Sequence, residues 1–436
     1  MESSAPPRPT RVLFIIKGIL ALAILATAAI LGGGIRHEAI SIGPIKLDLI
    51  LFGGVLLAIM FKDLLKVEAV SVGLAGLTLV VSHQLYMSKS LSEHLMHDHW
   101  HEAQSLINIF FLLLGFGLLA GDFKRSRLPD WLPAILPDDW KGGACILAFV
   151  LVISSFLDNI AAAMIGGVIA KQVFSGRVTV GYIAAIVACS NAGGAGSVIG
   201  DTTTTMMWID GVSPLDVAHA VLGALAAAAV VIPFAAKQQQ AFQPVLKDPS
   251  GGLAFAQVKK SWLCINALTL VGCIVANMKL GLPFVGVWSA LLAGELIQRR
   301  DKAAWAEMMH MVKDAVFITC LVAIASLMPV KELPQASVGT TFALGWLSAV
   351  FDNIPLTKLA LVLGGYDWGL LAFSVGYGGS ITWFGSSAGV AISSDFPQAK
   401  SIVQWMRQGW FVPVGYLVGF ATIVVLLGWH PHAPHR

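Results

Sequence analysis

The residues best suited to chemistry form one pattern that occurs twice in the chain. In each copy an Asp-Asn pair lies inside an apolar run, at Asp158-Asn159 and again at Asp352-Asn353. A glycine-rich segment follows each pair, at 191–201 in the first copy and at 376–386 in the second. Carboxylates inside apolar segments are costly and are seldom without a function. Glycine-rich interruptions at corresponding positions of two halves are typical of a transporter's binding site.

The two copies differ in their carboxylates. When the glycine pair at 193–194 is aligned with the pair at 378–379, Asp201 falls opposite Ser386. The first half therefore contributes Asp158 and Asp201, and the second contributes Asp352. Carboxylates that are close together in an apolar setting tend to retain protons, and a cation that binds among them would displace those protons. This competition is the physical basis of cation/proton exchange at one shared site.

Composition places the chain in the membrane. It has 436 residues, of which 56% are hydrophobic and 12% charged, and its mean hydropathy is +0.77. Soluble domains carry about 25% charged residues. The net charge of +3 and the lack of a basic block give no indication of a nucleic-acid partner. No catalytic triad, zinc-ligand spacing or phosphate-binding loop occurs, so we expect a protein that is not an enzyme and needs no cofactor.

The apolar runs predict an all-α polytopic membrane protein with about eleven transmembrane helices. A crossing needs roughly 20 apolar residues. The basic loops at 122–141, 237–260 and 299–302 are expected inside by the positive-inside rule. That assignment predicts a plasma (inner) membrane protein whose N-terminus is cytoplasmic and whose C-terminus is outside. The predicted crossings are 12–34, 48–61, 66–87, 105–121, 178–212, 215–236, 261–278, 283–298, 313–329, 369–392 and 408–429.

Two further apolar stretches are predicted to be re-entrant hairpins. The first, 142–171, has basic residues at both ends, which favours a hairpin over a single crossing because both flanks can then be cytoplasmic. The second, 334–363, would enter from the opposite side, as an inverted repeat requires. The helices at 178–212 and 369–392 are predicted to be broken at their glycines.

The predicted organisation has five parts. They are an N-terminal helix and loop at 1–47, a first inverted repeat at 48–236, a cytoplasmic linker at 237–260, a second inverted repeat at 261–429 and a tail at 430–436. The tail has no apolar cover and is expected to stay unpacked. The histidines from His83 to His101 are typical of an outer loop.

The segments 154–160 and 191–208 resemble the ion transporter superfamily, in particular its NhaD-type sodium/proton antiporters. The run 378–390 carries the second part of the resemblance. The resemblance implies exchange of sodium or lithium for protons, an inverted repeat and a homodimer in the lipid membrane. It implies that Asp158, Asp201 and Asp352 bind the transported sodium. The full set of implied site residues is Asp158, Asn159, Asn191, Asp201, Thr202, Thr203, Asp352, Asn353, Ser380, Ser386 and Ser387.

Several alternatives remain open at this point. The aspartates at 158, 201 and 352 could be helix caps, which is compatible with ion binding. An anion permease of the same superfamily, carrying citrate, another dicarboxylate or arsenite, would need cations beside these carboxylates. An inert membrane scaffold or a receptor is the alternative from another class, although a scaffold would gain nothing from paired breaks. Lys358, which lies near Asp352 in the sequence, could neutralise that residue, extend to the membrane surface or join the ion site.

Overall fold

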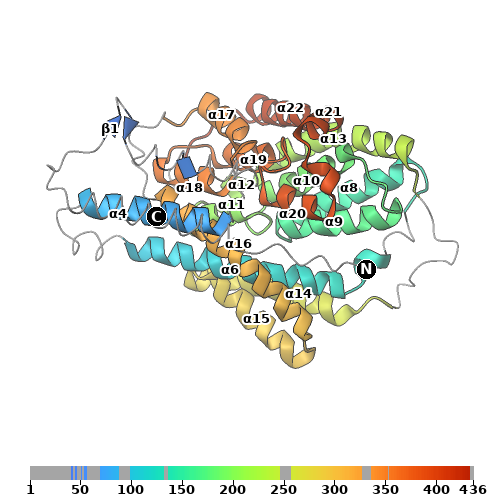
Figure 1. Ribbon diagram of the computed structural model, residues 1–436, viewed down its shortest axis with the longest axis horizontal. Helices are drawn as coiled ribbons and strands as arrows, with labels where there is room; N and C mark the ends of the chain where they lie inside the picture. The colour runs from blue at the N-terminus through green and yellow to red at the C-terminus, as the bar shows by residue number, and fades with distance from the viewer. Residues whose placement is uncertain are drawn as a thin grey trace, which may run out of the picture. The chain divides into compact units, whose positions relative to one another are not determined.

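The computed structural model describes most of the chain and divides it into two compact units (Figure 1). One unit comprises 1–106 with 312–333, and the other comprises 107–311 with 334–436. The predicted first crossing, most of the crossing at 48–61, and Asp352 lie outside the described residues. The residues described are 41–42, 45–46, 51, 54–55, 69–87, 99–131, 136–245, 257–326, 335–351 and 353–432.

The first unit holds α4 (Ala69–Met87) and the parts of α6 and α16 that fall within its bounds. It also contains a short antiparallel pair, β1 (Ser41–Ile42) and β2 (Ile45–Lys46), which the all-α prediction did not include. Gly73 of α4 packs against α16, where an added Cβ would lie 3.1 Å from the Phe317 ring. His83, predicted in an outer loop, lies instead within α4 and is only 3% exposed.

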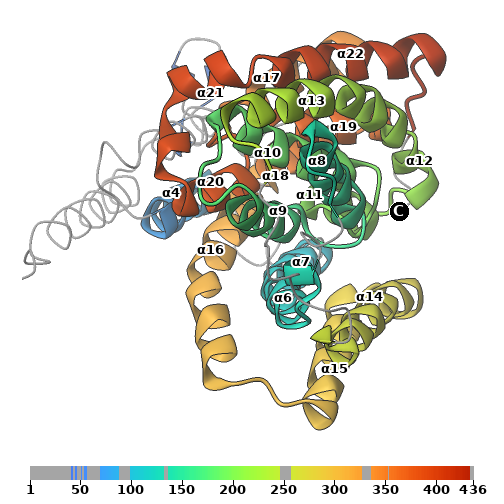
Figure 2. The same cartoon turned by 90° about the vertical axis from the view of Figure 1, so that its right-hand side faces the viewer.

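In the second unit, two apolar helices pack closely through glycines. They are α14 (Lys260–Leu280) and α15 (Pro283–Ile297), which lie side by side in Figures 1 and 2. A Cβ added to Gly286 of α15 would collide with the carbonyl oxygen of Gly272 in α14. The remaining helices outside the two repeated patterns are α6 (His99–Arg125), α7 (Leu128–Trp131) and α16 (Lys302–Ser326).

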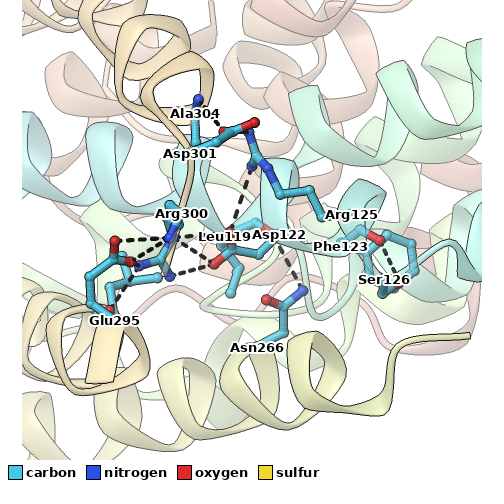
Figure 3. Close-up of polar contacts among 11 residues, drawn as sticks. Leu119, Asp122, Phe123, Arg125, Ser126, Asn266, Glu295, Arg300, Asp301 and Ala304 are labelled. Atoms are coloured by element: carbon cyan, nitrogen blue, oxygen red, sulfur yellow. Dashed lines mark hydrogen bonds and ion pairs between the residues drawn. The ribbon is translucent and has the colours of Figure 1, made fainter. Parts of the chain in front are cut away.

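A buried ion-pair cluster joins α6 to α15 (Figure 3). The Arg300 guanidinium donates to both oxygens of Asp122, with Nη2 2.5 Å from Oδ2, and Nη1 lies 2.7 Å from Glu295 Oε2. Arg300 Nη1 also donates to the Leu291 carbonyl. The Arg300 and Asp122 side chains are fully buried, so neither charge could stay there without the other.

The two repeated patterns each form a helical hairpin followed by a broken helix. Figure 1 shows the green helices of the first pattern packed among the orange and red helices of the second. The first set is α8 (Trp140–Ser154), α9 (Asn159–Val173), α10 (Val180–Ala195), α11 (Thr202–Ile209), α12 (Pro214–Ala218) and α13 (Ala220–Phe242). The second is α17 (Val338–Ser348), α18 (Asn353–Leu363), α19 (Trp368–Gly378), α20 (Ser387–Asp395), η4 (Pro397–Lys400), α21 (Ile402–Gln408) and α22 (Phe411–Leu426).

Among the described residues, three helices are long and apolar enough to cross a membrane. They are Leu106–Arg125, Pro214–Phe242 and Lys260–Leu280, and the bent pair α21–α22, with an angle of 61°, would be a fourth. The predicted number of about eleven crossings therefore stays a prediction. Several predicted crossings occur as shorter apolar helices, among them Val70–His83 and Pro283–Ile297, and the crossing at 178–212 is divided by its glycine-rich break. The chain is nevertheless a helical polytopic membrane protein.

Polar contacts tie together segments that are far apart in the sequence. Gln239 accepts from the Thr179 amide, and Gln238 donates to the Gln408 carbonyl. At another point His219 lies 2.6 Å from Asp367. The tail is packed there as well, since the His430 amide donates to Asp367 Oδ2, so the expectation of an unpacked tail is wrong for 430–432.

Candidate functional site

In each hairpin the second helix begins at an asparagine, Asn159 in the first and Asn353 in the second. In the first hairpin α8 ends at Ser154 and α9 begins at Asn159, after a turn at 155–158. Asp158 is the N-cap of α9, and its Oδ2 accepts from the Ile160 amide at 3.2 Å. The second hairpin turns at the same place, with α17 ending at Ser348 and α18 beginning at Asn353. The capping interpretation of Asp158 is therefore correct, and it leaves the other carboxylate oxygen available for a second role.

Each broken helix resumes directly after one of two residues that align between the copies. These residues are Asp201 in the first copy and Ser386 in the second. Asp201 caps α11 with Oδ1, which accepts from the Thr203 amide at 2.9 Å. Ser386 caps α20 in the same way by accepting from the Gly389 amide. The hydroxyls of Thr204 and Thr205 donate to the carbonyls of residues 197 and 198, so these two threonines hold the turns between α10 and α11.

Polar side chains from both halves meet at the breaks. Asn159 Nδ2 donates to Asn191 Oδ1 at 3.0 Å and to Asp201 Oδ2 at 3.1 Å. Asn191 Nδ2 in turn donates to Ser380 Oγ at 3.0 Å and to Ser386 Oγ at 3.1 Å. All five of these residues are buried. The hydrogen bonds thus run without interruption from the first hairpin, through both parts of the first broken helix, to both parts of the second.

The same backbone contacts support both breaks. Gly193 lies so close to α8 that an added Cβ would collide with the Leu151 carbonyl, and Gly378 stands in the same relation to the carbonyl of Gly345 in α17. The Ser154 hydroxyl donates to the Ser190 carbonyl at 2.5 Å, and residue 348 donates to the carbonyl of residue 375 at 2.7 Å. Within each half, these contacts fix the hairpin against the broken helix that follows it.

Three buried oxygens around Asp201 have no hydrogen-bond partner among the described residues. They are Asp158 Oδ1, Asn159 Oδ1 and Thr203 Oγ1. Asp158 also lies close enough to Asp201 for the two carboxylates to repel each other. A buried polar atom without a partner is costly. Carboxylate, amide and hydroxyl oxygens are the ligands that hard cations prefer, so the chemistry of this set fits a small cation.

The predicted residues do not all join this network. The amide of Thr203 reaches it through the Asp201 cap, whereas Thr202, Asn353 and Ser387 are the first residues of α11, α18 and α20. The Asn353 side chain is buried, and its Nδ2 has no partner in the described part of the chain. Asp352 lies outside the described residues. The described residues hold no group of three His, Cys, Asp or Glu suited to a metal ion.

Two contributions were missed in the sequence. The serines at 154 and 348, four residues before each Asp, brace the broken helices, and their identical offset was the available signal. Lys358 pairs with Asp210, at a distance of 2.8 Å between Nζ and Oδ2. No sequence pattern pointed to Asp210, because its partner is 148 residues away in the chain.

The chain is similar to curated sodium/proton antiporters. Sodium/proton antiporter 1 of Arabidopsis thaliana is 26% identical over 95% of this chain and 78% of the relative. The Na(+)/H(+) antiporter NhaD of Alkalimonas amylolytica is 26% identical over 81% of this chain and 83% of the relative. Sodium/proton antiporter 2 of Arabidopsis thaliana is 24% identical over 82% and 95%. No family model matches the chain. The resemblance expected from the sequence is confirmed by these homologues, all named as antiporters.

Proposed function

We propose that this protein is a secondary transporter that exchanges sodium or lithium for protons by alternating access. The observation that carries the proposal is the buried network in which Asn159 bridges Asn191 and Asp201 while Asn191 reaches the serines of the second half. The names of the homologous antiporters support the same exchange. The site binds small ions and carries out no covalent chemistry.

The exchange follows from competition at Asp201 and Asp158. A sodium ion among the carboxylate, amide and hydroxyl oxygens is stabilised by the negative charge of both side chains. Without the cation, the two buried carboxylates are poorly solvated and repel each other, and both effects favour the binding of protons in its place. Binding of the cation and binding of protons therefore exclude each other. If the site opens to one side of the membrane at a time, it carries sodium in one direction and protons in the other. Asp352 is proposed as the third carboxylate of the site.

The membrane location, the orientation and the oligomeric state of the protein are also part of the proposal. The protein would lie in the inner membrane with its N-terminus in the cytoplasm and its C-terminus outside, as a homodimer and with no cofactor besides the transported ions. Each half, with its hairpin and broken helix, would be one inverted repeat. The corresponding contacts at Gly193 and Gly378 support that relation.

The anion permease is the second candidate. An anion would need positive groups near the carboxylates. The candidate for such a group is Lys358, which lies on α18 five residues after Asn353. Its ammonium group is paired with Asp210, which makes it a poor counter-ion for a citrate or a dicarboxylate. The paired lysine and the orphaned oxygens favour cation exchange.

Everted vesicles with a preformed pH gradient test the proposal. Sodium or lithium added to wild-type vesicles should collapse the gradient, and Asp201→Asn should abolish the response because the neutral amide neither releases a proton nor attracts the cation. Asp395→Asn, an exposed acidic position at the end of α20, is the matched control and should respond as wild type does. Vesicles that ignore both cations but accumulate labelled citrate would contradict the proposal and support the anion permease.

A further inference from the structure

An ion pair that the proposed exchange does not use joins the two halves. Lys358 Nζ lies 2.8 Å from Asp210 Oδ2, and the two side chains are 7% and 14% exposed. Lys358 belongs to α18 in the second half, whereas Asp210 is the C-cap of α11 in the first. The pair is therefore a nearly buried charged contact between two site-bearing helices from opposite halves.

Both helices start at residues of the proposed site. α11 begins directly after Asp201, and α18 begins with Asn353. Lys358 is five positions along α18, which is about 7.5 Å, and Asp210 follows the 8 residues of α11, which is about 12 Å. The two helices pack against each other, so the pair fixes one against the other at a point one to two turns away from the ion site.

Stability alone gives a weak reason for this pair. An acidic residue at a helix C-terminus opposes the helix dipole. Burying two charges also costs desolvation, and a well-packed apolar pair is often as stable. What an ion pair adds is a defined partner and register, since a nearly buried charge is best stabilised by the opposite charge at hydrogen-bond distance. The location of this pair between the halves suits that role.

We propose that Lys358 and Asp210 are positioning residues that lock α18 to α11, so that the ends of the two helices at the ion site keep their spacing and move together. The inference rests on the proposed sodium/proton exchange. The pair acts through the helices and does not touch the ion. Loss of either charge would let the two helix ends drift apart, and the site would bind sodium less tightly without losing its own ligands.

The test is a charge-removal and charge-swap series in everted vesicles. The variants are Lys358→Met, Asp210→Asn, and the swap that combines Lys358→Asp with Asp210→Lys. Lys279→Met, on the exposed surface of α14, is the control. For each variant the half-saturating sodium concentration and the maximal rate of gradient collapse are measured, together with the amount of folded protein and its thermal unfolding in sodium-free detergent solution.

Each single variant should raise the half-saturating sodium concentration at least about fivefold and leave the maximal rate within about twofold, whereas the swap should recover much of the loss. Single variants that unfold earlier but keep the wild-type half-saturating concentration would overturn the positioning role, because the pair would then be structural only. A wild-type protein that shows no sodium response would overturn the proposed function itself. The two failures are therefore distinguishable.

Discussion

At the scale of single residues, Asn191 joins the two halves. Its Oδ1 accepts from Asn159 in the first hairpin, and its Nδ2 donates to Ser380 and Ser386 on either side of the second break. Amide side chains supply an acceptor and two donors, which is what this position uses. No other standard side chain of this length has both functions without a charge.

Replacing Asn191 with alanine should loosen sodium binding. The change removes three hydrogen bonds and leaves buried partners unsatisfied, so the half-saturating sodium concentration in vesicles should rise about tenfold or more. Asn108→Ala is the matched control, since Asn108 is an equally buried asparagine on α6 outside the network. A similar change in both variants would show that the loss is general and would contradict the assigned role of Asn191.

Sequence reasoning identified the residue types of the site but not their pairing. Asp158, Asn159, Asn191 and Asp201 stand out because polar groups within apolar runs are rare. The bonds from Asn191 to the second half join residues 189 and 195 positions apart, and no local periodicity encodes such contacts. Asp210 was missed for the same reason.

At the scale of helices, close backbone contact between α8 and α10 holds the first break in place. Gly193→Ala would drive a methyl group into the Leu151 carbonyl of α8 and should lower the free energy of unfolding by about 1–3 kcal/mol. Gly143→Ala on α8 is the control, because a Cβ there would have its nearest neighbour at an ordinary 3.5 Å. Thermal unfolding in detergent measures both variants. Equal stability of the two would contradict the close contact.

The ends of the helices were easier to predict than their lengths. The expected break in 178–212 falls between α10 and α11, and the one in 369–392 falls between α19 and α20, because consecutive glycines and capping residues mark such points. The predicted number of crossings is not tested by the helix lengths. Breaks and bends leave apolar helices too short for a length criterion, and the first predicted crossing is outside the described residues.

At the scale of the whole chain, the C-terminal segment is tied to the middle of the sequence at Asp367. This carboxylate accepts from the side chain or amide of His219, Leu370 and His430. Burial alone would raise the pKa of Asp367, but these hydrogen bonds, with that of His219 the largest, lower it below its ordinary value. No sequence pattern indicated this contact, since histidines in a polar tail have no distinctive spacing.

Asp367→Asn should therefore destabilise the protein in a pH-dependent way. Because the pKa of the folded state is lowered, the stabilisation is complete above the ordinary value of about 3.9 and is lost as the pH falls through the lowered one. Near neutral pH the variant should lose about 1.5–3 kcal/mol relative to wild type. Unfolding measured at several pH values checks this, with Asp395→Asn as an exposed control. A loss that persists unchanged at strongly acidic pH would contradict the charge-based explanation.

The most direct test of the central claim uses purified protein in proteoliposomes with an imposed pH gradient and labelled sodium outside. We expect the gradient, acidic inside, to drive sodium uptake against its concentration gradient. Uptake should stop when the pH gradient is abolished and should be absent in Asp201→Asn. Sodium that equilibrates without regard to the pH gradient, or labelled citrate that accumulates in its place, would contradict sodium/proton exchange at the shared carboxylate site.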